Sequence, residues 1–246
     1  MESAEYDALD RLEERMWWYR GLHRQMDAAL RRLLPALPAG PLLDAGCGTG
    51  GLLAFLRGAA GPRPRLGVEI HPAAALRARG KSGAAIAAGS LNALPLADRS
   101  VAAVLSADVL CHARVDPEVA LREIARVLRP GGYAVFNLPA YDWLRSAHDA
   151  RVHNARRFTA TGFAGQLRQA GLAPLRSTYW NSFLLPLMVL RRLFERGHTG
   201  KSDVMEYPAA INALFGAILG LERGLIALGL RLPAGGSLLV VARKNA

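Results

Sequence analysis

The sequence predicts an α/β fold built on a doubly wound sheet, and three stretches indicate it. Residues 42–51 read as a short apolar strand that ends in a carboxylate and a glycine-rich turn, followed by a segment with helical spacing. Residues 65–70 read as a second apolar strand that ends near an acid. Residues 121–136 change from helical periodicity to an apolar run across a Pro-Gly-Gly turn. Strands that alternate with helical segments are typical of a parallel sheet covered by helices.

The composition fits one folded unit. The chain has 246 residues, of which 51% are hydrophobic and 21% charged, enough for one sizeable core. Its two cysteines, Cys47 and Cys111, are not placed for an obvious bridge, which favours a reducing compartment. The acidic, polar start is unlike a secretory signal, and no run reaches about 18 uninterrupted apolar residues. We therefore expect a cytoplasmic protein.

The charge balance limits the classes of partner. The formal net charge is +11, and a basic surface attracts nucleic acids or anionic membranes. Zinc-ligand spacing and blocks of basic residues interleaved with aromatic ones are absent from the sequence, so we expect no nucleic-acid partner and no metal. The surplus charge favours a peripheral contact with the inner face of the membrane.

The glycine-rich turn indicates a nucleotide-type cofactor. Gly46, Gly48 and Gly51 fit the G-x-G-x-x-G pattern of dinucleotide-binding loops, where a pyrophosphate lies at a helix N-terminus. Asp44 stands at the strand tip before them. Two like charges about 4 Å apart cost roughly 4 kcal/mol at an effective dielectric of about 20, so a carboxylate here disfavours a pyrophosphate. It favours a cationic ligand instead.

From Asp44 onwards the chain resembles the class I S-adenosylmethionine (SAM)-dependent methyltransferases, in particular their type 11 group. The first motif of that family is an acid followed by G-x-G-x-G, and SAM carries an ammonium and a sulfonium but no phosphate. The resemblance continues in order through Glu69, residues 89–100 and residues 121–136, so it covers about residues 40–140. It implies a Rossmann-like, seven-stranded sheet and SAM as cofactor.

The matched positions give the cofactor-binding candidates of the core. They are Asp44, Gly46, Cys47, Gly48, Gly50, Glu69, Ser90, Leu91 and Asp108. Glu69 is expected to accept both ribose hydroxyls. Ser90 and Ala102 stand where the family has aspartates, and Ser90 can accept a hydrogen bond from adenine only without charge. We therefore expect a lower affinity for the adenine ring.

The segment before the core is predicted to be one helix over residues 5–34 that ends at Pro35. Leu9, Leu12, Met16 and Tyr19 share one stripe of it. The helix either packs over the core or forms a lid, over residues 1–39, on the methionine end of SAM. In the second case Tyr19 or Arg20 contacts the SAM carboxylate.

The segment after the fifth strand is the predicted place of substrate chemistry, because ligands of open α/β sheets bind beyond the carboxyl ends of the strands. The type 11 subgroup shows a similar H-D, then H-x-R-R-F pattern. The catalytic candidates are His148, Asp149 and His153. The substrate-binding candidates are His112, Tyr141, Trp143, Arg156, Arg157 and Asn181. The two arginines also suit a structural role, beside a helix capped by Thr159 or Thr161.

The last part of the chain carries an insertion before the final strand, residues 237–242. Residues 183–194 and 209–232 are apolar and helical in spacing, with Leu214, Ile218, Leu221, Leu225 and Leu228 on one stripe and Gly216, Gly220 and Gly224 on another. Glu222 and Arg223 argue against burial in lipid. Three interpretations stay open: a cap over an apolar substrate, a homodimer contact, and a helix that lies on the bilayer.

Together these features predict a single domain over residues 1–246: a lid (1–39), a SAM-binding core (40–140) and a substrate-side segment (141–246). The predicted activity is transfer of a methyl group from SAM to a small apolar or lipid-like acceptor by in-line displacement. Two other classes stay open on the sequence. An NAD(P)-dependent oxidoreductase shares the glycine pattern, and a non-catalytic SAM-fold partner protein is consistent with Ser90 and Ala102.

Overall fold

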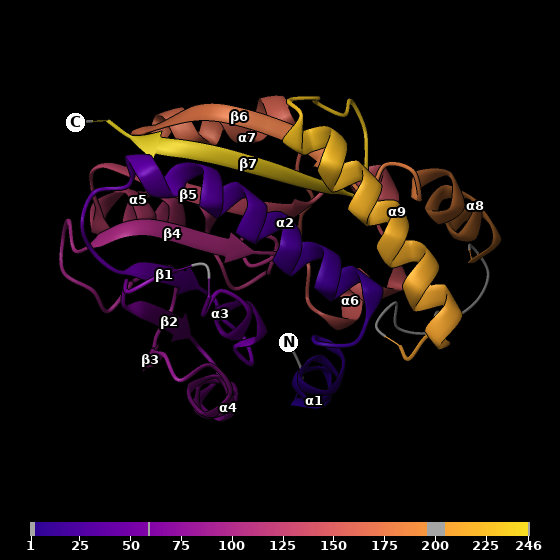
Figure 1. Ribbon diagram of the computed structural model, residues 1–246, viewed down its shortest axis with the longest axis horizontal. Helices are drawn as coiled ribbons and strands as arrows, with labels where there is room; N and C mark the ends of the chain where they lie inside the picture. The colour runs from indigo at the N-terminus through magenta and orange to yellow at the C-terminus, as the bar shows by residue number, and fades with distance from the viewer. Residues whose placement is uncertain (1–2, 59, 196–204, 246) are drawn as a thin grey trace.

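The fold is described here from a computed structural model, over residues 3–58, 60–195 and 205–245. A seven-stranded sheet of order β3-β2-β1-β4-β5-β7-β6 forms its centre (Figure 1). The strands are β1 (Leu42–Ala45), β2 (Arg65–Glu69), β3 (Ala85–Ala88), β4 (Val101–Ala107), β5 (Leu128–Pro139), β6 (Leu172–Trp180) and β7 (Ser237–Lys244). The first five run parallel, and β7 is antiparallel to both of its neighbours. The inserted antiparallel strand distinguishes this sheet from the 3-2-1-4-5-6 order of dinucleotide-binding folds, and the seven strands confirm the predicted fold class.

Helices cover both faces of the sheet, as a doubly wound architecture requires. They are α1 (Ser3–Leu12), α2 (Trp17–Leu33), α3 (Gly51–Phe55), α4 (Pro72–Ser82), α5 (Pro117–Val127), α6 (Ala147–Arg151), α7 (Ala160–Gln169), α8 (Leu185–Glu195) and α9 (Ala209–Ala227). Tyr133 and Val135 of β5 join the core under α2, α3 and α9, whereas Ala134 and Phe136 join the core under α5 and α7. This alternation along one strand separates the two halves of the core.

The passage from α5 to β5 shows how local sequence sets these boundaries. Asp116 caps α5, since its carboxylate accepts from the backbone N–H groups of Glu118 (2.9 Å) and Val119 (3.2 Å), and Pro117 takes the first helical position. The helix passes directly into β5, whose start includes Gly131 at φ +73°. A glycine suits that left-handed conformation.

The N-terminal segment differs from the single helix predicted over residues 5–34. It forms two helices, α1 and α2, because Met16 adopts an extended conformation and Glu13 turns its carboxylate toward the glycine loop. Glu13 accepts from Thr49 Oγ1 (2.7 Å) and from the backbone N–H of Gly51 (3.1 Å), and Lys81 of α4 forms an ion pair with it. Periodicity alone did not reveal the break, since the apolar stripe continues across it.

The insertion before the last strand is helical, as predicted, and forms α8 and α9. α9 packs along α2, with the Leu219 side chain seated over Gly21, where a β-carbon would lie 2.4 Å from Leu219 Cδ1. The close approach therefore uses a glycine of α2, whereas Gly216 and Gly220 of α9 border an open groove. In the described part of the chain, α9 is the one helix whose length and composition would allow it to cross a membrane.

Candidate functional site

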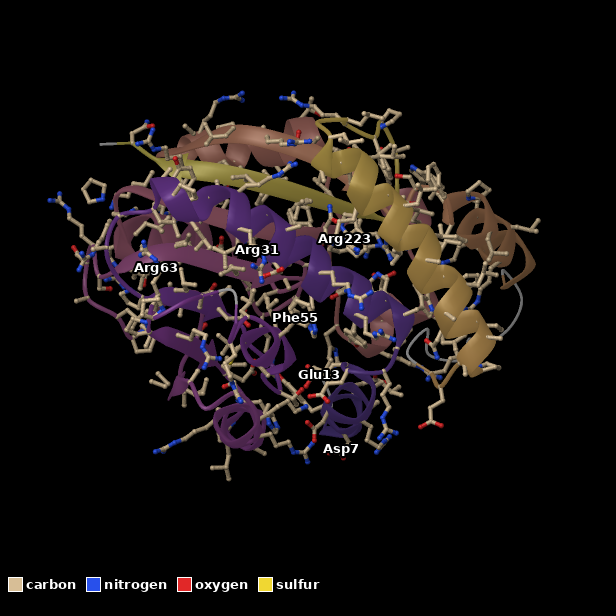
Figure 2. The ribbon with its side chains drawn as sticks, viewed as in Figure 1. Asp7, Glu13, Arg31, Phe55, Arg63 and Arg223 are labelled. Atoms are coloured by element: carbon tan, nitrogen blue, oxygen red, sulfur yellow. The ribbon has the colours of Figure 1, made fainter. Side chains whose placement is uncertain are left out.

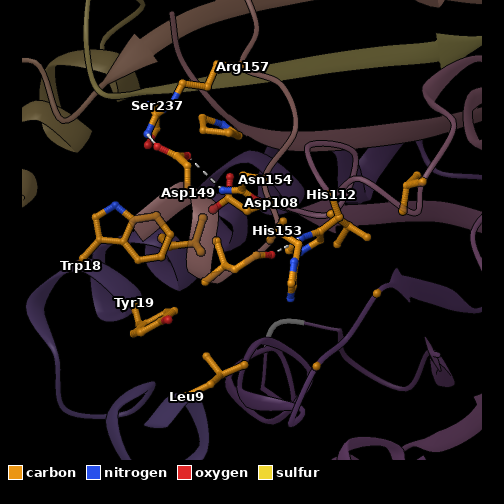
Figure 3. Close-up of a pocket in the computed structure, with 18 of the residues that line it drawn as sticks. Leu9, Trp18, Tyr19, Asp108, His112, Asp149, His153, Asn154, Arg157 and Ser237 are labelled. Carbon is orange, nitrogen blue, oxygen red and sulfur yellow. Dashed lines mark hydrogen bonds and ion pairs between the residues drawn. The ribbon is translucent and has the colours of Figure 1, made fainter. Parts of the chain in front are cut away.

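A cavity of about 560 Å³ lies at the carboxyl ends of the central strands. The glycine loop and α1 border one end of it, and residues 108–115, residues 149–157 and α8 border the other. Figure 3 shows Leu9 and Tyr19 on one side of this space, with Asp108, Asp149 and His153 across from them. The sequence placed substrate chemistry after β5, and the cavity joins part of that segment to the glycine loop.

The glycine loop turns tightly beneath this cavity. Gly46 lies at φ +84°, and a β-carbon on it would lie 2.4 Å from Val109 Cγ2, so only glycine fits. Gly46 and Gly48 line the cavity. Among the described residues, Gly50 and Cys47 do not: Gly50 packs its backbone against Ala78 of α4. The position of Gly50 therefore serves the packing of α3 on α4.

Three buried carboxylates surround the loop: Asp44, Glu69 and Glu13. Burial, together with the negative charges of Glu69 and Glu13, raises the pKa of Asp44 to about 8. Burial likewise raises the pKa of Glu13, against hydrogen bonds from Lys81 and Thr49. A cluster of this kind favours a cation, because a positive charge relieves the mutual repulsion of the carboxylates.

Glu69 is held by donors from three parts of the chain. Its Oε1 accepts from the Tyr6 hydroxyl (2.8 Å) and the His71 backbone N–H (2.9 Å), and its Oε2 accepts from the Gly48 backbone N–H (2.9 Å). Tyr6 also stacks on His71, with ring centroids 4.7 Å apart. Sequence reasoning missed Tyr6, since its only signal is an aromatic ring in an acidic helix.

The remaining cofactor candidates divide between the cavity and the surface. Ser90, Leu91 and Tyr19 line the cavity. Arg20 does not: it borders the groove between α2 and α9. Arg20 follows Tyr19 by about 100° around the helix, which turns it from the cavity toward α9. The predicted contact of Arg20 with the cofactor therefore lacks support from its position.

Asp108 stands at the end of β4, in the wall of the cavity. It adopts φ +54°, a conformation that costs energy for a residue with a side chain. Asn137 Nδ2 donates to both of its carboxylate oxygens (3.0 and 3.1 Å), and Asn137 Oδ1 accepts from Trp180 Nε1 (2.7 Å). Burial raises the pKa of Asp108 to about 7, although Asn137 and Arg157 act in the opposite direction. The side chain can therefore take up or release a proton near neutral pH.

Asp149 and Arg157 form a buried ion pair at 2.8 Å, visible in Figure 3. Ser146 and Asn154 donate further hydrogen bonds to Asp149. Burial alone would raise the pKa of Asp149, but Arg157 and these donors outweigh it and lower the pKa below its usual value. Asp149 thus stays ionised, which makes it a weak proton acceptor and a firm anchor for Arg157.

The predicted histidines have different surroundings. His153 lines the cavity, is exposed, and lies at φ +57°. His112 also lines it, with Nδ1 2.9 Å from the Val152 carbonyl oxygen, and burial lowers its pKa to about 4. His112 is therefore neutral at physiological pH. His148 belongs to α6, and its side chain lies outside the described residues.

The other substrate candidates lie partly away from the cavity. Asn181 lines it at φ +57°, whereas Tyr141, Trp143 and Arg156 are not among its described lining residues. Tyr141 stacks between Trp143 and Tyr179, and its hydroxyl donates to Pro233. Arg156 donates to the carbonyls of Leu110, His112 and Val115, which holds the loop after β4 in place. In this position Arg156 has the structural role that the sequence had left open as an alternative to substrate binding.

Among the described residues, no group of three or more His, Cys, Asp or Glu side chains could hold a metal ion. The cavity is otherwise well suited to SAM. Gly46 and Gly48 bring the loop to the cavity wall, Glu69 lies at the tip of β2 where ribose hydroxyls are expected, and the buried carboxylates favour a cation.

Comparisons with known proteins agree with this geometry. A family model described as a methyltransferase domain matches residues 43–136. A malonyl-[acyl-carrier protein] O-methyltransferase of Herminiimonas arsenicoxydans is 33% identical over 135 residues, which are 55% of this chain and 47% of that protein. A ubiquinone/menaquinone biosynthesis C-methyltransferase of Rubrivivax gelatinosus is 30% identical over 63% of this chain and 72% of that protein. The chain thus spans about half the length of the first relative.

Solved structures of methyltransferases have a similar fold. A methyltransferase of Haloferax volcanii, solved with the Trm112 methyltransferase activator, superposes with a TM-score of 0.58 at 21% identity and covers 98% of both chains. The strand order of the sheet, the glycine loop and the matched family model all indicate a methyltransferase domain. The chain belongs to the class I SAM-dependent methyltransferases, in their type 11 group.

Proposed function

We propose that this protein transfers a methyl group from SAM to a small, apolar or lipid-like acceptor. The observation that carries the proposal is the single cavity, which joins the acidic glycine loop to the side chains of Asp108, His112 and His153. When bound, SAM supplies an electrophilic methyl group on its sulfonium. Gly46, Gly48 and Glu69 line the cavity and would hold it, whereas Asp44, also a predicted cofactor contact, is buried and is not among the described lining residues. The remaining volume of the cavity then belongs to the acceptor.

The apolar part of the cavity wall supports an apolar acceptor. Its described lining includes Met16, Trp17, Trp18, Leu22, Val152 and Met188. Trp18 also stacks on the buried Trp180, with ring centroids 6.4 Å apart. Side chains of this kind exclude water and favour hydrophobic ligands. The name of the Rubrivivax relative, which refers to quinone biosynthesis, is consistent with such an acceptor.

Asp108 is the proposed proton acceptor when the methyl acceptor arrives protonated. A pKa of about 7 leaves a useful fraction of its carboxylate ionised near neutral pH, and the group faces the cavity. Asp149 instead positions Arg157. Most of the acceleration then comes from holding the reacting groups in line, with α1 and the start of α2 as the lid that excludes water. His153, a catalytic candidate on the sequence, lines the cavity and is proposed here as a substrate contact instead.

The first experiment identifies the acceptor. The purified protein is incubated with methyl-labelled SAM and a whole-cell extract, and the label is partitioned between aqueous and organic phases. We expect label in the organic phase, and Asp108→Asn should lower its rate by about 10²-fold or more while SAM binding by calorimetry is kept. Full activity of Asp108→Asn would remove Asp108 as the base.

A non-catalytic role is the second candidate, because Ser90 lines the cavity where the family has an aspartate. Label in neither phase, together with confirmed SAM binding, would favour that role over methyl transfer. Label in the aqueous phase alone would retain the enzyme but contradict the apolar acceptor.

A further inference from the structure

The outer face of α9 is an uninterrupted apolar surface. Six exposed positions follow one another at intervals of four and three residues: Ala210, Leu214, Ala217, Leu221, Gly224 and Leu228. The three leucines are 58%, 60% and 82% exposed. Of the 14 exposed large hydrophobic side chains in the described chain, nine lie between residues 183 and 230. This concentration marks an interaction surface rather than scattered surface residues.

The inner face of the same helix is fixed to the domain. Leu219 sits over Gly21 of α2, and the buried Glu222 carboxylate accepts from the backbone N–H groups of Ser182 (2.8 Å) and Phe183 (2.6 Å). Figure 1 shows α9 lying beside α2 along the front of the molecule. To cross a bilayer, the helix would have to lose these contacts and carry Glu222 into lipid. α9 therefore lies along the surface.

A basic groove runs beside the apolar face. Arg20 and Arg24 of α2 and Arg223 of α9 border it, together with Asn212 and small residues of α9. Figure 2 places Arg223 between the two helices. The nearby carboxylate, Asp27, is paired with Arg31 at 2.8 Å, and none of the three groove arginines has a hydrogen bond or ion pair within the described residues. Their charges remain available to an anionic partner.

Trp17 connects this surface to the cavity. It borders both the cavity and the groove, and its indole packs edge-on against Phe215 of α9 at 5.1 Å between ring centroids. Met188 of α8 and Tyr207 also line the cavity, so its apolar wall continues toward α8 and α9. Trp17 is thus the point at which the α9 surface and the cavity meet.

We infer that the outer face of α9 and the arginine groove beside it dock on the anionic surface of a lipid bilayer. Leu214, Leu221 and Leu228 enter the acyl boundary, and Arg20, Arg24 and Arg223 meet lipid phosphates. A second copy of the chain fits the charges less well, because pairing through α9 would bring two arginine grooves together without carboxylates between them. The docking itself does not depend on the proposed function. Only its purpose, which is access to an apolar acceptor, rests on that function.

Vesicle sedimentation tests the docking without SAM or acceptor, so its failure is separate from any failure of methyl transfer. We expect binding to vesicles of phosphatidylglycerol and phosphatidylcholine, weaker binding to phosphatidylcholine alone, and loss of binding as salt rises. Arg20→Gln/Arg24→Gln should weaken binding by roughly 25-fold, since each basic residue near an anionic surface contributes about fivefold. Leu214→Gln/Leu221→Gln should weaken it by roughly tenfold or more.

Matched controls lie elsewhere on the surface. Leu76→Gln on α4 replaces a leucine that is 73% exposed, and Arg168→Gln on α7 removes an exposed charge from the opposite face of the sheet. Circular dichroism confirms that every variant is folded. Equal losses in the controls would reduce the effect to net charge and overturn the proposal. Absence of vesicle binding would overturn it too, and a dimer in sedimentation equilibrium that Leu214→Gln/Leu221→Gln dissociates would assign the face to a second copy.

Discussion

At the scale of single residues, most of the hydrogen-bond acceptor positions of Glu69, at the cofactor end of the cavity, are already used by donors of the protein itself. An ionised carboxylate offers about four acceptor positions, and three are used by Tyr6, His71 and Gly48. A ribose needs two for its hydroxyls. One donor must therefore withdraw, and Tyr6 is the one that can do so without a change of the backbone loop.

Tyr6→Phe should bind SAM more tightly. The variant keeps the ring that stacks on His71 but lacks the hydroxyl that competes with the ribose, which is worth about 0.5 to 1.5 kcal/mol. Calorimetry should show a Kd that is roughly 2- to 12-fold lower than in the wild type. A higher Kd would instead mean that the Tyr6 hydroxyl stays in the complex as a cofactor contact.

Asp44→Asn should make the protein more stable while it weakens SAM binding. Burial raises the folded-state pKa of Asp44 to about 8, so the folded protein binds a proton that the unfolded chain releases near pH 4. Between these values Asp44 costs stability as pH rises, at up to roughly 1.4 kcal/mol per pH unit, and the cost levels off above pH 8. In urea unfolding from pH 5 to 8, the free energy of unfolding of the variant should rise relative to that of the wild type. A constant difference would contradict the raised pKa.

At the scale of elements, β1, β2 and β4 could be predicted, because each is an apolar run that ends beside a glycine or an acid. The break between α1 and α2 could not, since it depends on Glu13 reaching Thr49 and Gly51, far along the chain. The exposure of Leu214, Leu221 and Leu228 could not be predicted either. The spacing of apolar residues shows that they share one side of a helix, but not whether that side faces the core or the solvent.

Glu222→Ala should destabilise the fold through the seating of α9. It leaves the half-buried backbone N–H groups of Ser182 and Phe183 without their acceptor, and hydrogen bonds to a charged group contribute about 1.5 to 3 kcal/mol. Chemical denaturation should show a loss in the free energy of unfolding of this size. The neighbouring exposed Leu221→Ala serves as control and should change it by no more than about 0.5 kcal/mol. Equal effects would show that Glu222 is not an anchor.

At the scale of the whole molecule, the cofactor end of the site could be predicted better than the substrate end. Asp44, Gly46 and Glu69 are local to strand tips, whereas the cavity wall needs α1, α8 and residues 149–157 to converge. Asp108 was assigned to the cofactor from its place after β4, and its value as a base appears only with Asn137 and Arg157 around it.

Thermal unfolding should distinguish the cofactors for the intact chain. SAM at 100 times its Kd adds about 2.7 kcal/mol to the folded state, which for a chain of this size corresponds to a rise in Tm of roughly 5 to 10 °C. NAD should leave the Tm unchanged, because the Glu69 carboxylate already accepts from the backbone N–H of Gly48, where a pyrophosphate would need free N–H donors. A rise with NAD and none with SAM would contradict the assignment of the loop.

The position of β7 sets the order in which the sheet can be completed during synthesis. β6 has no strand neighbour other than β7, and β5 lacks its second neighbour until residues 237–244 pair with it. While the ribosome is still making α9, the nascent chain therefore holds two open strand edges and the apolar helix that follows them. Such edges pair with other chains when they persist. A pause in translation before residue 237 should thus aggregate this protein more than a pause after residue 140, when β6 and α9 are not yet made and β5 alone waits for β7.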